Sequence, residues 1–189
     1  MAHTVTLVRH GQTESSARGA YSGQSDIPLT EVGREQALQA ATLLAGAGID
    51  AVISSPLIRA RDTARAIAAA TGAPLTIDER LVEVDYRPFE GLDRDGARAK
   101  FRAPFDAWRA DPFGAPVPGM EPLADALARA RAGTADALAR YEHPVIVGHQ
   151  GILRVVLVAL GEIRACDYFA TRLNEAEPLV VHRPAIAAT

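Results

Sequence analysis

Two histidines stand directly after short apolar runs in distant parts of the sequence. His10 follows residues 5–8 and Arg9, and His149 follows residues 145–147 and a glycine. Both runs are typical of buried strands, and the ligands of open α/β sheets bind beyond the carboxyl ends of such strands. A neutral imidazole is a nucleophile or a base, and an arginine binds phosphate oxygens in pairs. The pattern therefore predicts a site for an anionic substrate.

A third apolar run, residues 51–54, leads through a Ser-Pro-Leu turn toward Arg59. A phosphate monoester carries a charge of about −1.5 to −2 near neutral pH, and guanidinium groups stay charged while they bind it. We expect Arg9 and Arg59 to clamp such a phosphate. Gly11, which lacks a Cβ, would let the backbone approach the phosphate closely.

These segments, taken in order, resemble the motifs of the histidine phosphatase superfamily, also called phosphoglycerate-mutase-like. The matching segments are Leu-Val-Arg-His-Gly-Gln-Thr-Glu at 7–14, Ser-Ser-Pro-Leu-Ile-Arg-Ala at 54–60, Leu-Val-Glu at 81–83, Glu-Gly at 90–91, Gly119 with Glu121 and Arg129, and Val-Gly-His-Gln-Gly-Ile-Leu-Arg at 147–154. The resemblance covers about residues 4–182 and rests on several separated motifs rather than on one.

The resemblance implies a role for each motif residue. His10 is the nucleophile that forms a phosphohistidine, and Glu83 donates a proton to the leaving alkoxide and later activates water. His149 would hydrogen-bond the transferring phosphoryl group. Phosphate binding is assigned to Arg9, Arg59, Gly11 and Gln150. Substrate contacts are expected from Thr13, Ser16, Ser22, Gly23 and Arg87. Glu14, Glu121 and Arg129 stay open between a structural and a functional role.

The sequence departs from the family pattern at three places. Ser15 and Ser16 stand where many members have Trp-Asn, and Arg-Pro-Phe at 87–89 replaces the common Gly-x-Trp. Gln150 replaces the small residue that usually follows the second histidine, as in the fructose-2,6-bisphosphatase branch. We expect an ordinary phosphate pocket next to an unusual pocket for the rest of the substrate.

Composition limits the other possibilities. The 189 residues suit one domain, residues 1–189, and the net charge of −3 disfavours a general nucleic-acid surface. The single cysteine, Cys166, excludes an internal disulfide and a cysteine cluster for zinc. No secretory signal and no apolar segment of about 20 residues is present, so we expect a cytoplasmic protein without a membrane partner. The sequence implies no metal or cofactor, and it does not indicate the oligomeric state.

The elements that must position these residues follow a βα alternation, which predicts a three-layer α/β/α sandwich around a mostly parallel sheet. Residues 86–118 interrupt the alternation with five of the 12 prolines and four of the five phenylalanines. We expect this segment to form a small cap over the site. The predicted strands are residues 5–8, 51–54, 74–77, 145–147 and 179–182. The predicted helices are 30–45, 56–71, a short piece at 95–101, 122–141 and 152–160.

Three functions remain in competition at this point. The short chain favours a metal-independent phosphatase acting on small phosphate monoesters, because mutases of the family generally carry added segments. The alternative is a cofactor-dependent phosphoglycerate mutase. A catalytically idle phosphate-binding module is less favoured, since Arg9, His10, Arg59, Glu83 and His149 are all present.

Overall fold

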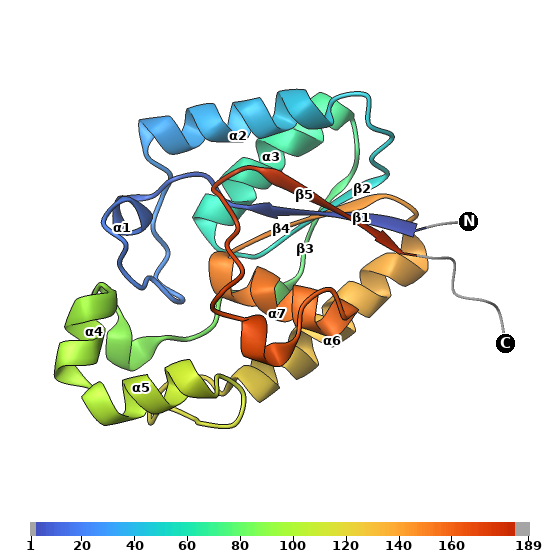
Figure 1. Cartoon of the computed structure of the whole chain (residues 1–189). Helices are drawn as coiled ribbons and strands as arrows, with labels where there is room; N and C mark the ends of the chain where they lie inside the picture. Colours follow the sequence, from blue (N-terminus) through green and yellow to red (C-terminus); the bar gives the residue numbers. More distant parts are fainter. Residues whose placement is uncertain (1–2, 184–189) are drawn as a thin grey trace, which may run out of the picture.

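A computed structural model describes residues 3–183 of the chain. Its centre is one five-stranded sheet in the order β3-β2-β4-β1-β5 (Figure 1). The strands are β1 (His3–Arg9), β2 (Ala51–Ser54), β3 (Leu75–Ile77), β4 (Pro144–Gly148) and β5 (Pro178–Arg183). The first four are parallel to their neighbours, and only β5 runs antiparallel, beside β1.

The two central strands are nearly continuous apolar runs. In β1 and β4, Leu7 pairs with Ile146 and Val8 with Val147, and all four side chains are buried. Strands that are covered on both faces need apolar residues at every position, and these two strands satisfy that requirement. Their register places the residues after Arg9 beside those after Gly148, which brings the two predicted histidines together.

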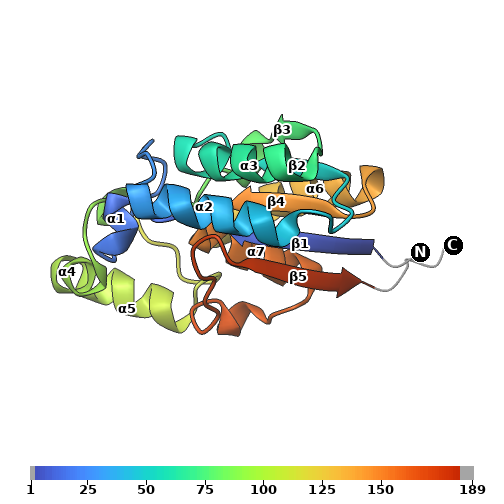
Figure 2. The same cartoon turned by 90° about the horizontal axis from the view of Figure 1, so that it is seen from above.

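Helices cover both faces of the sheet, which confirms the predicted three layers (Figure 2). Helices α2 (Glu31–Leu44) and α3 (Ile58–Thr71) pack with small side chains such as Ala40 and Ala64 against Val52. Helices α6 (Leu123–Arg140) and α7 (Gln150–Leu160) cover the opposite face. Thr30 caps the start of α2 by accepting the Gly33 N–H, as Ser/Thr residues do at helix N-termini.

The cap carries helices α4 (Arg94–Lys100) and α5 (Arg102–Ala110), and Figure 1 shows both beside the carboxyl ends of the parallel strands. Its core is aromatic. The Trp108 ring lies 5.7 Å from Phe89 and 4.7 Å from Phe169, measured between centroids. Phe169 comes from the segment after α7, so edge-on aromatic packing joins the cap to the main body.

The structure also departs from the predicted elements. A short helix, α1 (Glu14–Ala17), lies between the first predicted strand and the first predicted helix, where no element was predicted, and α5 follows the predicted short helix in the cap. Pro56 lies before α3 rather than in its first turn, since the helix begins at Ile58. Within the described residues, none of the helices has the length and apolar character needed to cross a bilayer.

Candidate active site

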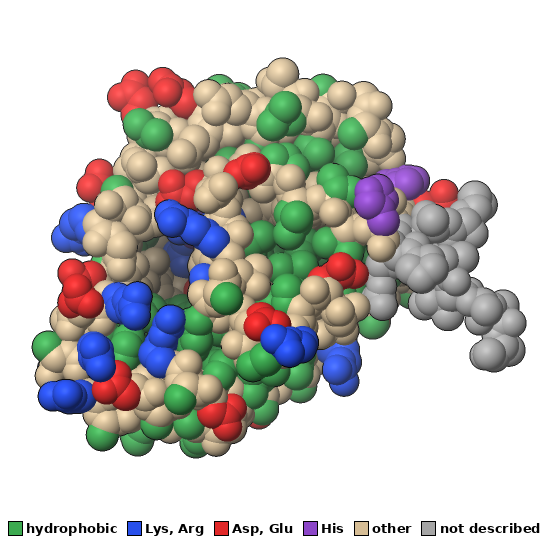
Figure 3. Space-filling model, in the orientation of Figure 1, with side chains coloured by type: hydrophobic (Ala, Val, Ile, Leu, Met, Phe, Trp, Pro, Cys, Tyr) green, Lys and Arg blue, Asp and Glu red, His purple; other side chains and the backbone are tan. Residues whose placement is uncertain are grey.

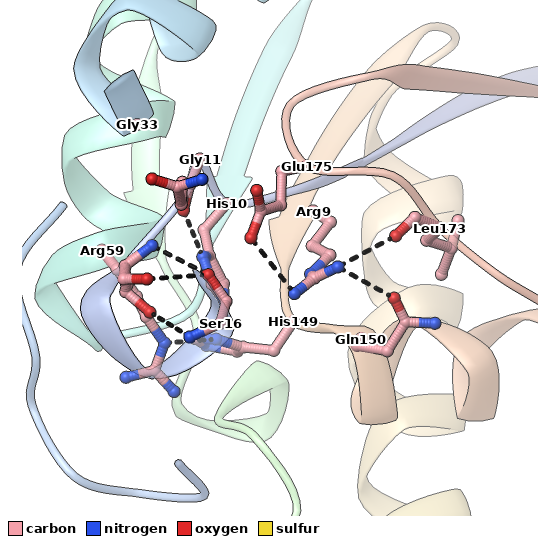
Figure 4. Close-up of polar contacts among 12 residues, drawn as sticks. Arg9, His10, Gly11, Ser16, Gly33, Arg59, His149, Gln150, Leu173 and Glu175 are labelled. Carbon is pink, nitrogen blue, oxygen red and sulfur yellow. Dashed lines mark hydrogen bonds and ion pairs between the residues drawn. The ribbon is translucent and has the colours of Figure 1, made fainter. Parts of the chain in front are cut away.

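The predicted phosphate and catalytic residues converge at the carboxyl ends of β1 and β4, on a cavity of about 240 Å³ (Figure 4). Eight of the predicted site residues line it. They are Arg9, His10, Ser16, Ser22, Gly23, Arg59, Glu83 and Gln150. His149 lies directly behind this wall, with its ring centroid 5.1 Å from that of His10.

The contacts of His10 fix which nitrogen is free. Nδ1 lies 2.7 Å from the carbonyl oxygen of Gly11, so this nitrogen carries the proton and donates it. Nε2 is then the unprotonated nitrogen. Burial, together with the positive charges of Arg59 and Arg9, lowers the pKa of His10 well below its ordinary value of 6.5. The ring is therefore neutral near pH 7, which is the form that attacks phosphorus.

Arg59 is held rigidly although its side chain is charged and buried. Its Nη1 donates to the carbonyl of Ser25 at 2.6 Å, and its Nη2 donates to that of Gly23 at 2.8 Å. Its Nε donates to Nδ1 of His149 at 3.1 Å. Nη2 also donates to the carbonyl of Ser22 at 3.4 Å, so four of the five N–H groups of the guanidinium orient it and one, on Nη1, is left for a ligand. The loop that precedes α2 thus fixes a positive charge beside His10.

His149 has protein partners on both ring nitrogens. Nδ1 accepts from Arg59, and Nε2 lies 2.7 Å from the hydroxyl of Ser55. Burial and then the charge of Arg59 lower its pKa well below 6.5. The predicted hydrogen bond from His149 to the phosphoryl group stays a prediction. In this geometry His149 orients Arg59.

Glu83 binds the N-terminus of α7. One carboxylate oxygen accepts the N–H groups of Val84 and Ile152, each at 2.8 Å, and the other accepts that of Gly151 at 2.9 Å. Helix N-termini offer unpaired N–H groups and a favourable dipole to such an anion. Only 6% of Glu83 is exposed, and the residue faces the cavity. Three backbone N–H groups thus fix the carboxyl group in the cavity wall.

Arg129 and Glu121, whose role the sequence left open, support Glu83 from behind. Arg129 donates to both carboxylate oxygens of Glu121, at 2.7 and 2.8 Å. Its Nη1 also donates to the carbonyls of Arg80 and Val82, each at 2.7 Å. The pair therefore fixes the backbone just before Glu83, and neither residue lines the cavity.

Arg9 is held more loosely than Arg59. Its Nη1 donates to Oε1 of Gln150 at 3.3 Å and to the carbonyl of Leu173 at 3.2 Å, and its Nη2 lies 3.4 Å from Glu175 (Figure 4). Its Nε is buried and has no partner among the described residues. Gln150 thus positions Arg9 from the first turn of α7. The unpartnered Nε is a donor that a phosphate oxygen would satisfy.

Besides His149, three predicted site residues lie outside the cavity wall: Gly11, Thr13 and Arg87. A Cβ on Gly11 would collide with the carbonyl of Gly33 in α2, and the Gly11 N–H donates to Thr63 at 3.1 Å. The glycine is therefore needed for the close packing of two chain segments, and it does not line the cavity where phosphate is expected. Thr13 is fully buried and caps α1. The side chain of Arg87 is 80% exposed and pairs with Asp85 at 2.7 Å.

The other predicted substrate residues do reach the cavity. Ser16 closes the capping box of α1, with its hydroxyl bonded to the backbone of Thr13. Ser22 and Gly23 contribute the carbonyls that hold Arg59. A side chain on Gly23 would press on the carboxylate of Glu90 and the backbone of Tyr86. These three residues therefore shape the wall and orient the arginine.

Sequence reasoning missed six further wall residues: Gly19, Ala20, Tyr21, Tyr86, Arg94 and Arg154. Arg154 follows Gln150 by four residues on α7, and residues with this spacing share one helix face. This spacing was visible in the sequence and could have indicated that Arg154 lies on the same side of the helix as Gln150. Arg94 belongs to α4 of the cap, and only the folded chain brings it to the cavity.

Within residues 3–183, no cluster of three or more His, Cys, Asp or Glu side chains is arranged to hold a metal ion. The independence from metals and cofactors stays a prediction.

The family model described as histidine phosphatase superfamily (branch 1) matches residues 5–183. The chain belongs to this superfamily. Among similar curated histidine phosphatase relatives is the 2,3-bisphosphoglycerate-dependent phosphoglycerate mutase of Rhizobium etli. It is 33% identical over 94% of this chain and 89% of its own length. A bifunctional protein of Mycobacterium tuberculosis is 40% identical over 80% of this chain, but the match covers only 39% of that protein.

Solved structures of the superfamily have the same fold. The mycobacterial glucosyl-3-phosphoglycerate phosphatase bound to VO3 superposes with a TM-score of 0.84 at 30% identity, covering 94% of this chain and 92% of that one. A putative α-ribazole-5′-P phosphatase from Escherichia coli gives 0.83 at 28% identity, covering 96% and 91%. Histidine phosphatase relatives of similar length thus include both phosphatases and mutases, so chain length does not decide between these activities.

Proposed function

We propose that this protein is a metal-independent phosphatase that hydrolyses small phosphate monoesters through a phosphohistidine at His10. The observation that carries the proposal is the free Nε2 of a neutral, buried His10 in a cavity that also holds Arg9, Arg59 and Glu83. Nucleophile, phosphate clamp and proton donor then surround one space. The similarity to the mycobacterial glucosyl-3-phosphoglycerate phosphatase and to the α-ribazole-5′-P phosphatase from Escherichia coli supports the proposal.

In the first step, Nε2 of His10 attacks phosphorus and the bond to the leaving oxygen breaks. A protonated Glu83 gives that oxygen its proton, so a neutral alcohol departs and Glu83 becomes a carboxylate. The imidazole keeps the proton on Nδ1 and becomes cationic when Nε2 binds phosphorus. Its bond to the Gly11 carbonyl stabilises this charge. Arg9 and Arg59 offset the negative charge on the phosphoryl oxygens.

In the second step, water attacks phosphorus and the Glu83 carboxylate takes its proton. The bond from Nε2 breaks, which returns a neutral His10 and releases inorganic phosphate. Water has access because exposed Arg94 and Gly19 line the cavity, and Figure 3 shows a hollow on the surface beside these segments. An open cavity favours hydrolysis over reversal of the first step.

Phosphoglycerate mutase activity is the second candidate, favoured by the similarity to the Rhizobium etli phosphoglycerate mutase. It would use the same phosphohistidine but return the phosphoryl group to a sugar acid instead of water.

The deciding experiment measures two products from purified protein in excess chelator. Released phosphate is followed with an aryl and an alkyl phosphate, and isomerisation is followed with 3-phosphoglycerate primed by 2,3-bisphosphoglycerate. We expect phosphate release to dominate and His10→Asn to abolish it. Isomerisation much faster than phosphate release would establish the mutase, and activity that disappears with chelator and returns with a divalent ion would refute metal independence.

A further inference from the structure

Glu175 is a largely buried carboxylate beside the phosphate clamp, and the proposed mechanism does not use it. Its Oε1 lies 3.4 Å from Nη2 of Arg9, and each of the two side chains is only 17% exposed. In Figure 4 the carboxylate approaches the guanidinium from one side, and Gln150 and Leu173 bind it from the other. Arg9 lines the cavity, whereas Glu175 lies behind the wall. The clamp therefore has a counterion within the protein.

The contact between Arg9 and Glu175 is loose. The other seven ion pairs among residues 3–183 have N–O distances of 2.7 or 2.8 Å. Attraction between charges is stronger where water is excluded, so a buried pair gains the most from close contact. Burial lowers the pKa of Arg9, and Glu175 is the largest of the charges that oppose this shift. Glu175 thus offsets the charge of Arg9 without forming a short hydrogen bond to it.

The guanidinium of Arg9 has N–H groups to spare on the side of Glu175. Nη1 donates to two acceptors, Nη2 to one, and the buried Nε to none among the described residues. Nε and Nη2 lie side by side, and this edge of a guanidinium binds two phosphate oxygens in parallel. A buried donor without an acceptor is unfavourable, so an oxygen that reaches Nε is bound well. A phosphoryl group on this edge competes with Glu175 for Nη2.

The backbone fixes Glu175 at this place. Residue 175 pairs with Arg9 in an isolated parallel bridge, and the N–H of Ala176 donates to the Arg9 carbonyl at 2.8 Å. The φ of Ala176 is 51°, in the left-handed region that residues with a Cβ rarely adopt, and its side chain is buried. Strained positions of this kind persist only where surrounding contacts hold them, and they are concentrated at functional sites. The strained turn thus keeps a carboxylate beside Arg9.

We propose that Glu175 competes with the phosphoryl group for Arg9 and so sets the affinity of the phosphate clamp. In the free protein its carboxylate balances the charge of Arg9. When a phosphate binds, its oxygens take over Nη2 and Nε, and the displaced carboxylate repels them. Inorganic phosphate then leaves readily after the second step. This inference rests on the proposed function, in which Arg9 binds the phosphoryl group.

The test measures the binding of inorganic phosphate by calorimetry at neutral pH and fixed salt, so its result does not depend on turnover. Glu175→Gln keeps the shape of the side chain and an oxygen for Nη2 but removes the negative charge. We expect this variant to bind phosphate about 10-fold more tightly, the size of one hydrogen bond to a charged group. A residue that only orients Arg9 would give an equal or lower affinity.

The matched control is Glu177→Gln, which makes the same change in net charge two residues away at an exposed position. It should keep the phosphate affinity of the unmodified protein. A double-variant cycle then assigns the effect to Arg9, because in an Arg9→Gln background Glu175→Gln should tighten binding much less. Tightening of the same size without Arg9 would contradict competition for that residue.

A crystal structure of the unmodified protein with inorganic phosphate tests the same point without a variant, which matters if Glu175→Gln does not fold. We expect phosphate oxygens on Nε and Nη2 of Arg9 and a longer distance from Nη2 to Glu175. Unchanged or weaker phosphate binding in Glu175→Gln would overturn the proposal, as would a bound phosphate that leaves the contact between Arg9 and Glu175 as it is. Failure of the proposed function gives a different result: Glu175→Gln would still bind phosphate more tightly while no monoester is hydrolysed.

Discussion

The floor of the cavity and the cap above it hold their polar groups in opposite ways. In the floor, which we define as His10, Arg59, Glu83 and His149, each side chain is buried and has named protein partners. In the cap, Arg94 is exposed and has no ion-pair partner among the described residues. Protein contacts preorganise the floor, whereas within residues 3–183 no ion pair fixes Arg94 in the cap.

The physical origin of the difference is the support behind each region. Strand ends and the N-terminus of α7 fix the floor, because backbone groups there have few alternative positions. The cap is joined to the body mainly by aromatic contacts such as Trp108 with Phe169. Ion pairs within the cap, such as Arg98 with Asp106 at 2.7 Å, lie on its exposed side rather than in the cavity wall. Changes in the floor should therefore affect all substrates, and changes in the cap should affect selectivity.

The largest effect is expected from His10→Asn. Removing the nucleophile should lower kcat/KM by about 10⁴-fold or more on every substrate, as for other covalent catalysts. The thermal midpoint should change little beyond the loss of one bond to the Gly11 carbonyl. Rapid quench with labelled substrate checks the assignment directly, since an acid-labile adduct should form on the unmodified chain and not on the variant. An adduct that persists in His10→Asn would place the nucleophile elsewhere.

Glu83→Gln should divide substrates by their leaving group. An alkyl phosphate needs a proton on its departing oxygen, so kcat/KM should fall about 10²- to 10⁴-fold, the usual range for general acid catalysis. An aryl phosphate, whose oxyanion is already stable, should lose much less. The measurement is single-turnover kinetics on both substrates, so that the second step does not mask the first.

The matched control for Glu83→Gln is Asp85→Asn, whose carboxylate pairs with Arg87 outside the cavity. It should keep the rates on both substrates. Equal losses on alkyl and aryl phosphates in Glu83→Gln would remove Glu83 from the proton-donor role.

The floor should also make stability depend on pH. The folded protein keeps His10 and His149 neutral because their pKa values lie well below 6.5, whereas the unfolded chain binds protons near that value. The unfolded state therefore gains protons first as pH falls. The stabilisation is fully present above about pH 6.5 and is lost below it, at about 1.4 kcal/mol per pH unit for each histidine.

Urea denaturation at pH 6.5 and 5.5 measures this loss. His149→Asn should show a shallower decline than the unmodified protein, and His182→Asn, an exposed control, should show the same decline. An identical slope in His149→Asn would contradict a neutral buried histidine.

The smallest effect is expected from Arg87→Gln, because this cap residue points away from the cavity. Its pair with Asp85 is exposed on the arginine side, and such pairs contribute at most about 1 kcal/mol. Steady-state kinetics on charged and neutral substrates should agree with the unmodified protein within about twofold. A selective loss on anionic substrates would instead place a substrate contact on this side of the cap.

Much of the floor could be predicted from the sequence alone. Arg9 and His10 follow the apolar run of residues 5–8, whose composition favours a buried strand. Arg59 follows the second such run, residues 51–54, after a short turn. Parallel strands place their carboxyl ends at one edge, so local patterns were enough to bring these residues together. The family resemblance added Glu83, which the structure brings to the same cavity. The predicted strand bounds differ from the observed ones by at most two residues.

The tertiary structure decided what depends on contacts between distant segments. Gly11 meets Gly33, and Thr13 is buried beneath α1, so neither faces the cavity. Arg87 and Arg94 are both charged residues of the cap, yet only Arg94 lines the wall. Residue type and local spacing determine which strands and helices form and which end carries the reactive groups. The direction of a side chain across a gap between elements depends on their packing, which no local pattern encodes.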